Sequence, residues 1–457
     1  MIFFSPRDTM PTKVFLLALL ILSCTLPVLH AQETPAIMIH PRASEEIILA
    51  VADAQPATSE KSAELTDALK TFNQVLWDDL SFCGFFTLAG KSYYPPQPIN
   101  RVEDINYDAW NTLSSKVSFL TAATLDLRDG LVRAEVRIID MKQRSISFGT
   151  DFRGNADQIR SIAHRWADEI VYKLSAGASR GIASTRIAYV LRKGKAKEIY
   201  LMDYDGYNQY AFTQNGALNL FPNWAPDNSR LAFTSARSRK WEINIFSYTD
   251  GSRLAFPIFN SFASTPAISP DGTEIAYALR TPRGDTDIFI SKLDGSNRRN
   301  ISNNPALESS PTWSPSGKQI AYASGSEGIG SQVFICDADG ANVRKIIKEG
   351  GDSDSPAWSP DGRWIAFHWK PHLSTRYDLF VAEASSGKIR QLTSNSGSNE
   401  SPSWAPDSRH LVFQSNRSGN TQIYIMLLND SEPRLITQQG TNTSPAWSGY
   451  FRRETKN

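Results

Sequence analysis

This chain has few cysteines and almost no net charge. Its 457 residues include only 3 cysteines, and Cys24 lies in an apolar segment at the start. Cys83 and Cys336 are far apart in the sequence, so we expect two buried free thiols and not a disulfide-stapled scaffold. The 48 basic and 47 acidic side chains leave a formal net charge of +1. This near balance argues against nucleic-acid binding through bulk positive charge.

A long apolar run occurs only near the start, from Val14 to Leu29. Its length of about 16 residues falls short of the ~20 that a transmembrane helix needs. Arg7 and Lys13 precede the run, and the small residue Ala31 follows it. This arrangement predicts an export signal over residues 1–31 that is cleaved after Ala31. The mature chain is then expected to be soluble outside the cytoplasm, with no transmembrane segment.

Three alternatives remain for this segment. An uncleaved segment would act as a membrane anchor. The stretch Ile21-Leu22-Ser23-Cys24 loosely resembles a lipobox, which would attach a lipid to Cys24. Met10 could be the true start, and the signal would then be more compact.

Residues 32–180 are predicted to form a small α/β domain. Glu46–Ala54 is apolar and reads as a buried strand, and Tyr107–Ser115 as a short helix. A longer helix is indicated by apolar residues that share one helical face: Leu65, Leu69, Phe72, Leu76 and Leu80.

The second half of this domain shows clearer patterns. Leu131–Asp140 alternates apolar and polar residues, which predicts a strand with one wet face, and Ser145–Phe152 is its expected hairpin partner. Asn155 and Gln158 have the spacing of a capping box before a last helix. An apolar stripe then marks that helix: Ile159, Ile162, Ala163, Trp166, Ile170 and Leu174.

Residues 181–457 contain a repeat. A segment of the form x-P-x-[WI]-[SA], here called the P-x-W strand, occurs six times at gaps of 44, 45, 45, 46 and 43 residues. Its aromatic or isoleucine position is filled by Trp224, Ile268, Trp313, Trp358, Trp404 and Trp447. We interpret the tryptophans as packing between neighbouring units.

Two further elements recur with the same period. An [IL]-[AV]-[FY] strand begins at Ile187, Leu231, Ile275, Ile320, Ile365 and Leu411. A third strand ends in turns such as Asp294-Gly295, and a short fourth strand closes each unit. Four short strands every 40–50 residues are typical of a β-propeller blade.

The order of these elements predicts ring closure. The first [IL]-[AV]-[FY] strand precedes every P-x-W strand, and the last P-x-W strand has no successor. Pairing Ser444–Ser448 beside Arg186–Val190 would complete one blade and leave no open edge. We therefore predict an all-β six-bladed propeller closed by the C-terminal strand. A linear β-solenoid is the alternative.

Motifs that carry chemistry are few. Gly177–Gly181 matches G-x-S-x-G, but a helix precedes it and a strand follows, the reverse of a nucleophile elbow. His368 and His372 flank a Trp-Lys-Pro stretch and read as surface loop histidines, while His164 reads as a structural histidine. No catalytic residue, metal ligand or cofactor is predicted. The D-x-D pairs are too short for an EF-hand and would bind a cation only adventitiously: Asp203 with Asp205, and Asp352 with Asp354.

Three stretches of the chain resemble the TolB family, the periplasmic propeller proteins of the Tol–Pal system. They are IAHRWADEI at 162–170, TRIAYV at 185–190 and DYDGYNQ at 203–209. The terminal SPAWS at 444–448 is similar to the family's closing strand. The resemblance covers nearly the whole mature chain and has both domains in the same order.

The resemblance implies a non-enzymatic periplasmic scaffold that supports envelope integrity and cell division. Such proteins bind the lipoprotein Pal through one propeller face and TolA through the mature N-terminal segment, here Ala36, Ile37, Met38 and Ile39. We expect a monomer that binds no nucleic acid. The matching face positions precede the P-x-W strands: Leu220, Phe221, Ser264, Thr265, Ser309, Ser310, Asp354, Ser355, Glu400, Ser401, Thr443 and Ser444.

Two departures from the family and two rival functions remain. The mature start is only loosely like the family's partner-binding strand, and Ile268 replaces a tryptophan. A propeller can assemble an active site from several blades without a local motif, so a periplasmic glycosidase or lactonase is one alternative. A propeller that binds envelope sugar is the other.

Overall fold

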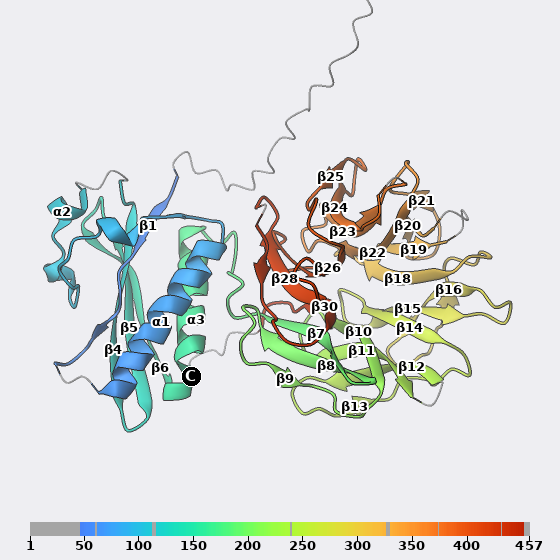
Figure 1. Cartoon of the computed structure of the whole chain (residues 1–457), viewed down its shortest axis with the longest axis horizontal. Helices are drawn as coiled ribbons and strands as arrows, with labels where there is room; N and C mark the ends of the chain where they lie inside the picture. The colour runs from blue at the N-terminus through green and yellow to red at the C-terminus, as the bar shows by residue number, and fades with distance from the viewer. Residues whose placement is uncertain are drawn as a thin grey trace, which may run out of the picture. The chain divides into compact units, whose positions relative to one another are not determined.

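The computed structural model describes 46–59, 62–111, 116–237, 240–325, 330–372, 374–430 and 432–451 (Figure 1). The predicted export signal and the predicted TolA-binding residues Ala36, Ile37, Met38 and Ile39 lie outside the described residues.

The N-terminal part is one mixed sheet with strand order β3-β1-β4-β5-β6, and β2 pairs with β4. Parallel pairing joins β1 to β3 and β4, and antiparallel pairing joins β4, β5 and β6. The predicted strand at Leu131–Asp140 and its hairpin partner are confirmed. The strands are β1 Ile48–Val51, β2 Gln55–Pro56, β3 Thr87–Leu88, β4 Phe119–Arg128, β5 Leu131–Asp140 and β6 Ser145–Asn155.

Helices α1 (Ala63–Phe82) and α3 (Ile159–Leu174) lie side by side on one face of this sheet (Figure 1). Helix α1 begins where the Ser62 hydroxyl accepts a hydrogen bond from the Leu65 amide at 3.0 Å. Its predicted apolar face is buried against the sheet and α3, except that Leu69 is only partly buried.

The expected cap of the last helix is present in modified form. The Asn155 amide donates to Gln158 Oε1 at 3.0 Å, but a 3₁₀ turn, Ala156–Gln158, precedes α3. Trp166 of α3 is fully buried, and its indole donates to Thr121 Oγ1 of the sheet at 3.0 Å. This bond fixes the helix on the sheet.

The opposite face of the sheet is covered by the segment between β3 and β4, which contributes Ile99, Ile105 and Trp110 to a second small core. The segment contains two 3₁₀ turns and the short helix α2: Lys91–Tyr93, Val102–Asp104 and Tyr107–Asn111. Helix α2 starts where the sequence predicts, and residues 112–115 lie outside the described residues.

The repeat region contains strands β7 to β30, and each repeat element recurs six times among the described residues. The P-x-W strands are β10 Leu218–Trp224, β14 Ala263–Ile268, β18 Glu308–Trp313, β22 Asp352–Trp358, β26 Asn399–Trp404 and β30 Asn442–Trp447. The [IL]-[AV]-[FY] strands are β7 Arg186–Lys193, β11 Arg230–Arg237, β15 Glu274–Arg280, β19 Gln319–Ser324, β23 Trp364–Lys370 and β27 His410–Ser415.

The remaining strands complete each repeat. The third strands are β8 Ala196–Asp203, β12 Lys240–Ser247, β16 Thr286–Lys292, β20 Gln332–Asp337, β24 Asp378–Glu383 and β28 Gln422–Leu427. The short fourth strands are β9 Tyr210–Ala211, β13 Arg253–Leu254, β17 Arg299–Asn300, β21 Arg344–Lys345, β25 Ile389–Gln391 and β29 Arg434–Leu435.

Four sheets of four strands follow the chain in order, from β14–β17 to β26–β29. The other strands of the repeat region form one larger sheet, in which β8 and β10 are linked by a single residue pair, Leu218 with Lys197. In that sheet β30 pairs antiparallel with β7, and Trp447 lies opposite Ile187. The last P-x-W strand thus pairs with the first [IL]-[AV]-[FY] strand, as the repeat order predicts.

The repeat tryptophans join neighbouring sheets through hydrogen bonds as well as packing. Trp313 Nε1 donates to the Ala267 carbonyl of the preceding sheet at 2.9 Å, and Trp404 Nε1 to the Ala357 carbonyl at 2.9 Å. Trp224 Nε1 donates to the Ala446 carbonyl of β30 at 3.2 Å, within the larger sheet. Trp358 differs, because it donates to Gly362 in its own turn.

The described residues include two cysteines, Cys83 and Cys336, and both are buried free thiols as predicted. Among these residues we find no helix with the length and apolar character needed to cross a bilayer.

Candidate functional site

One unusual backbone conformation recurs at the residue just before the proline of each P-x-W strand. We call these six residues the bulge positions. Each lies at a register shift between its strand and the next, which is a β-bulge. Their φ angles lie in the left-handed region: Phe221 54°, Thr265 49°, Ser310 54°, Ser355 51°, Ser401 53° and Ser444 49°.

Left-handed backbone is uncommon outside glycine and is strained for a β-branched residue such as Thr265. Strain of this kind tends to gather at binding surfaces, where surrounding contacts hold it in place. Because the same conformation occurs at six equivalent positions, it is a regular structural feature of the repeat.

Side chains of the preceding sheet hold several of these bulges. The Thr265 amide donates to Thr234 Oγ1 at 3.0 Å, and the Ser310 amide to Thr265 Oγ1 at 3.2 Å. The Ser401 amide donates to His368 Nδ1 at 3.3 Å, and the Ser444 amide to Gln414 Oε1 at 2.8 Å. Four of the six bulge positions therefore lie at contacts between successive sheets.

The structure brings the predicted face residues to these bulges, but it does not expose them equally. Ser264 is buried, with 4% exposure, so its side chain lies beneath the surface that the others offer. Phe221 is the most open, at 40%. The remaining members are half-buried: Leu220, Thr265, Ser309, Ser310, Asp354, Ser355, Glu400, Ser401, Thr443 and Ser444.

Three carboxylates, Asp352, Asp354 and Glu400, lie near enough to His368 to act on its charge. The Ser309 hydroxyl donates to Asp354 Oδ2 at 3.4 Å, which links two sheets. Burial lowers the pKa of His368, against the opposing pull of the three carboxylates. The prediction of a surface loop histidine is wrong for His368, because it lies buried within β23.

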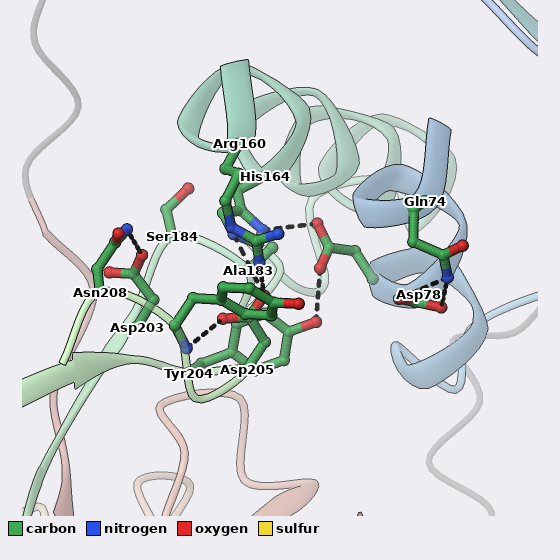
Figure 2. A network of polar contacts seen from close by, with 12 residues as sticks. Gln74, Asp78, Arg160, His164, Ala183, Ser184, Asp203, Tyr204, Asp205 and Asn208 are labelled. Carbon is green, nitrogen blue, oxygen red and sulfur yellow. Dashed lines mark hydrogen bonds and ion pairs between the residues drawn. The ribbon is translucent and has the colours of Figure 1, made fainter. Parts of the chain in front are cut away.

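A second polar cluster joins α1, α3 and the turn after β8 (Figure 2). His164 Nδ1 lies 2.8 Å from Asp79 Oδ2, and the Tyr204 hydroxyl donates to Asp79 Oδ1 at 2.6 Å. Burial lowers the pKa of His164, but the adjacent Asp79 more than offsets this and raises it to about 9. The structural role predicted for His164 fits these contacts.

The sequence patterns did not single out Asp79 as a site residue, although its position in the helix is unusual for an acidic side chain. It lies between Leu76 and Leu80 on the apolar face of the predicted helix, where an acidic residue needs a buried partner. That position alone could have marked it as part of a buried polar network.

The G-x-S-x-G stretch does not form a nucleophile elbow. Ser179 is buried in the turn after α3. In the same connection between α3 and β7, the Asp168 carboxylate accepts hydrogen bonds from the Ala183 and Ser184 amides at 2.8 and 2.9 Å. These contacts hold the link between helix and strand, as expected.

Comparisons with known proteins match the repeat region by sequence and most of the chain by fold. The family model described as PD40, TolB beta propeller domain, matches residues 173–372 and 348–451. A Tol-Pal system protein TolB of Desulfosudis oleivorans is 28% identical over 231 residues, covering 50% of this chain and 51% of that protein. The corresponding protein of Bordetella parapertussis is 30% identical over 237 residues and 52% of each chain.

The chain spans about half the length of these curated relatives in the matched regions. A solved structure, that of TolB from Acinetobacter baumannii, superposes with a TM-score of 0.73 at 21% identity. The superposition covers 89% of this chain and 97% of that one, which extends the likeness in fold to the N-terminal part.

Proposed function

This chain belongs to the TolB β-propeller family, and from that premise we propose that it is a non-enzymatic periplasmic scaffold of the Tol–Pal system. It binds a Pal-like lipoprotein through the bulge positions and a TolA-like inner-membrane protein through its N-terminal segment. In this role it supports envelope integrity and cell division. The observation that carries the proposal is the family match across the repeat region.

The proposal includes a division of the chain. Residues 1–31 are an export signal, residues 32–180 an α/β domain, and residues 181–457 a propeller of six blades. Pairing of β30 with β7 supports closure of the ring, and β30 also contacts β26 and β10 on either side.

Pal-like binding at the bulge positions is supported by their chemistry. Half-buried hydroxyls at these positions offer hydrogen-bond acceptors, and so do the carboxylates of Asp354 and Glu400, which directly precede two of the bulge positions on neighbouring sheets. Side chains of the preceding sheets already fix several bulge backbones, so less conformational entropy is lost on binding. A partner with basic and amide groups at its contact surface would complement this face.

The test is capture of a purified Pal-like lipoprotein by the mature chain, residues 32–457. Asp354→Arg and Glu400→Arg should each weaken capture by about tenfold or more, because each places a like charge against a basic partner. Asp294→Arg is the matched control, since Asp294 is exposed in the turn that follows β16, at the opposite end of its sheet. Equal affinity of all three variants would move the binding site elsewhere.

The same preparation distinguishes a scaffold from an enzyme. We expect no turnover of generic ester or glycoside substrates by the protein that captures the lipoprotein. Turnover without capture would favour the enzyme alternative.

A further inference from the structure

The ring nitrogen Nε2 of His164 is buried and has no hydrogen-bond partner among the described residues. The side chain is only 5% exposed, and its other nitrogen is already engaged by Asp79. Nε2 faces Asp205 Oδ2 at 3.7 Å, too far for a hydrogen bond. Figure 2 shows His164 and Arg160 projecting from α3 toward the turn that carries Asp205.

Asp203 and Asp205 stand at the end of β8 and in the turn after it. One ligand atom from each of these aspartates and one from His164 all lie within 4.8 Å of one another. The carboxylate side of the cluster reaches solvent, because the Asp203 and Asp205 side chains are 17% and 20% exposed. An ion could therefore enter from that side.

Carboxylates lie around the cluster that His164 Nε2 faces. Asp79, Asp203 and Asp205 contribute three carboxylates. Two arginines oppose them: Arg160 pairs with Asp205, and Arg186 Nε lies 3.7 Å from Asp203. A bound cation would add positive charge to this acidic cluster.

We propose that His164 Nε2, Asp203 and Asp205 bind one divalent cation of the Zn²⁺ class. An imidazole nitrogen with two carboxylates suits Zn²⁺, which takes three protein ligands and leaves a fourth position for water. Ca²⁺ prefers six to eight oxygen ligands and Mg²⁺ a near-octahedral oxygen shell, and this set offers neither.

The neighbours of His164 fit such a site. Asp79 accepts from Nδ1, an outer-shell contact that fixes the ring and directs Nε2 at the ion. Arg160 competes for Asp205, but its guanidinium also stacks 3.5 Å over the Tyr207 ring, which can hold it when the ion binds. Asn208 donates to Asp203 and orients that carboxylate.

The ion would join α3 of the N-terminal part to the larger sheet of the repeat region, which contains β8. This inference does not depend on partner binding, so either proposal can fail alone.

The test is titration of the metal-free mature chain, without a histidine tag, with Co²⁺ as a coloured substitute for Zn²⁺. We expect one Co²⁺ per chain, with the intense visible bands of four-coordinate cobalt that added Zn²⁺ removes. His164→Gln and Asp205→Asn should abolish the bands, and the exposed His372→Gln should retain them.

If His164→Gln does not fold, Asp203→Asn still decides the question, because that side chain lies at the solvent side and should weaken binding without unfolding the chain. Arg160→Gln should tighten binding by removing the competing cation. Absence of stoichiometric Co²⁺ binding would overturn the proposal. Bands that persist in His164→Gln would do the same.

Discussion

His410 Nε2 lies 2.8 Å from the carbonyl oxygen of Phe82, a residue 328 positions away at the end of α1. His410 Nδ1 faces Asp407 Oδ2 at 2.7 Å. The imidazole thus lies between two oxygen atoms, one on each side of the ring. This buried imidazole therefore joins β27 to the N-terminal part.

Replacing His410 tests this contact. His410→Leu should lower the free energy of unfolding by about 3–5 kcal/mol, because it leaves the buried Asp407 carboxylate without the imidazole that pairs with its Oδ2. Urea denaturation gives the value. His372→Leu is the control and should change stability by less than about 0.5 kcal/mol, since His372 is exposed. A similar loss in both variants would contradict the account.

Stability should also depend on pH through Asp407. Burial raises the pKa of this carboxyl, but His410 and the Arg409 amide more than offset that effect and leave the pKa below its usual value. Its contribution is complete above the unfolded-state pKa of ~3.9 and is lost as pH falls through the lower folded value.

The Asp407→Asn variant separates this contribution from other acid effects. The stability difference between wild type and Asp407→Asn should be largest near pH 6 and should shrink toward pH 3, as measured by urea denaturation. Asp430→Asn, at an exposed position, should show no such trend. A difference that stays constant with pH would exclude the ionised carboxylate as its source.

The repeat tryptophans differ in what their indole nitrogens bind. Trp404→Phe should lower the free energy of unfolding by about 1–3 kcal/mol, because the half-buried Ala357 carbonyl loses the indole donor. Trp358→Phe should cost less, since that indole bonds only to its own turn. Thermal unfolding of the pair measures the difference, and the reverse order would argue against sheet-to-sheet bonding.

Because the backbone at the bulge positions is left-handed, we expect a β-branched substitution there to lower stability. Ser310→Val should destabilise the fold by about 1–3 kcal/mol, because a β-branched side chain strains backbone at a φ of 54°. The neighbouring Ser309→Val serves as control and should cost less. Chemical denaturation compares the two, and equal losses would show that the strain is unimportant.

Both mature thiols should be inert in the folded chain. Burial raises the pKa of Cys83 to about 11 and that of Cys336 to about 12. Ellman's reagent at pH 8 should therefore react with neither thiol in the native protein lacking residues 1–31. In urea it should react with both. Rapid native reaction of one thiol would show local opening around it.

Much of the fold could be predicted because its signals are local and repeated. The fixed period of the P-x-W strands indicated the four-strand repeat, and the incomplete first and last units indicated that Trp447 pairs near Ile187. The capping residue Asn155 marked the approach to α3, although the intervening 3₁₀ turn has no distinct sequence signal.

The clusters between sheets and helices were harder to predict. His368 was misplaced because Trp369-Lys370-Pro371 suggests a loop, whereas β23 continues to Lys370. Asp79 lies 85 residues from His164, and Phe82 lies 328 residues from His410, so no local spacing reveals these two contacts. Such contacts depend on how α1 packs against the repeat region, which composition and periodicity do not encode.

The central claim is that the bulge positions form the surface for a Pal-like lipoprotein. Hydrogen–deuterium exchange of the mature chain, with and without a saturating amount of that lipoprotein, tests it most directly. The account predicts slower exchange in the segments that contain the bulge positions, and no change in the turns at the opposite ends of the sheets. Protection confined to those turns, or to the N-terminal part, would contradict it.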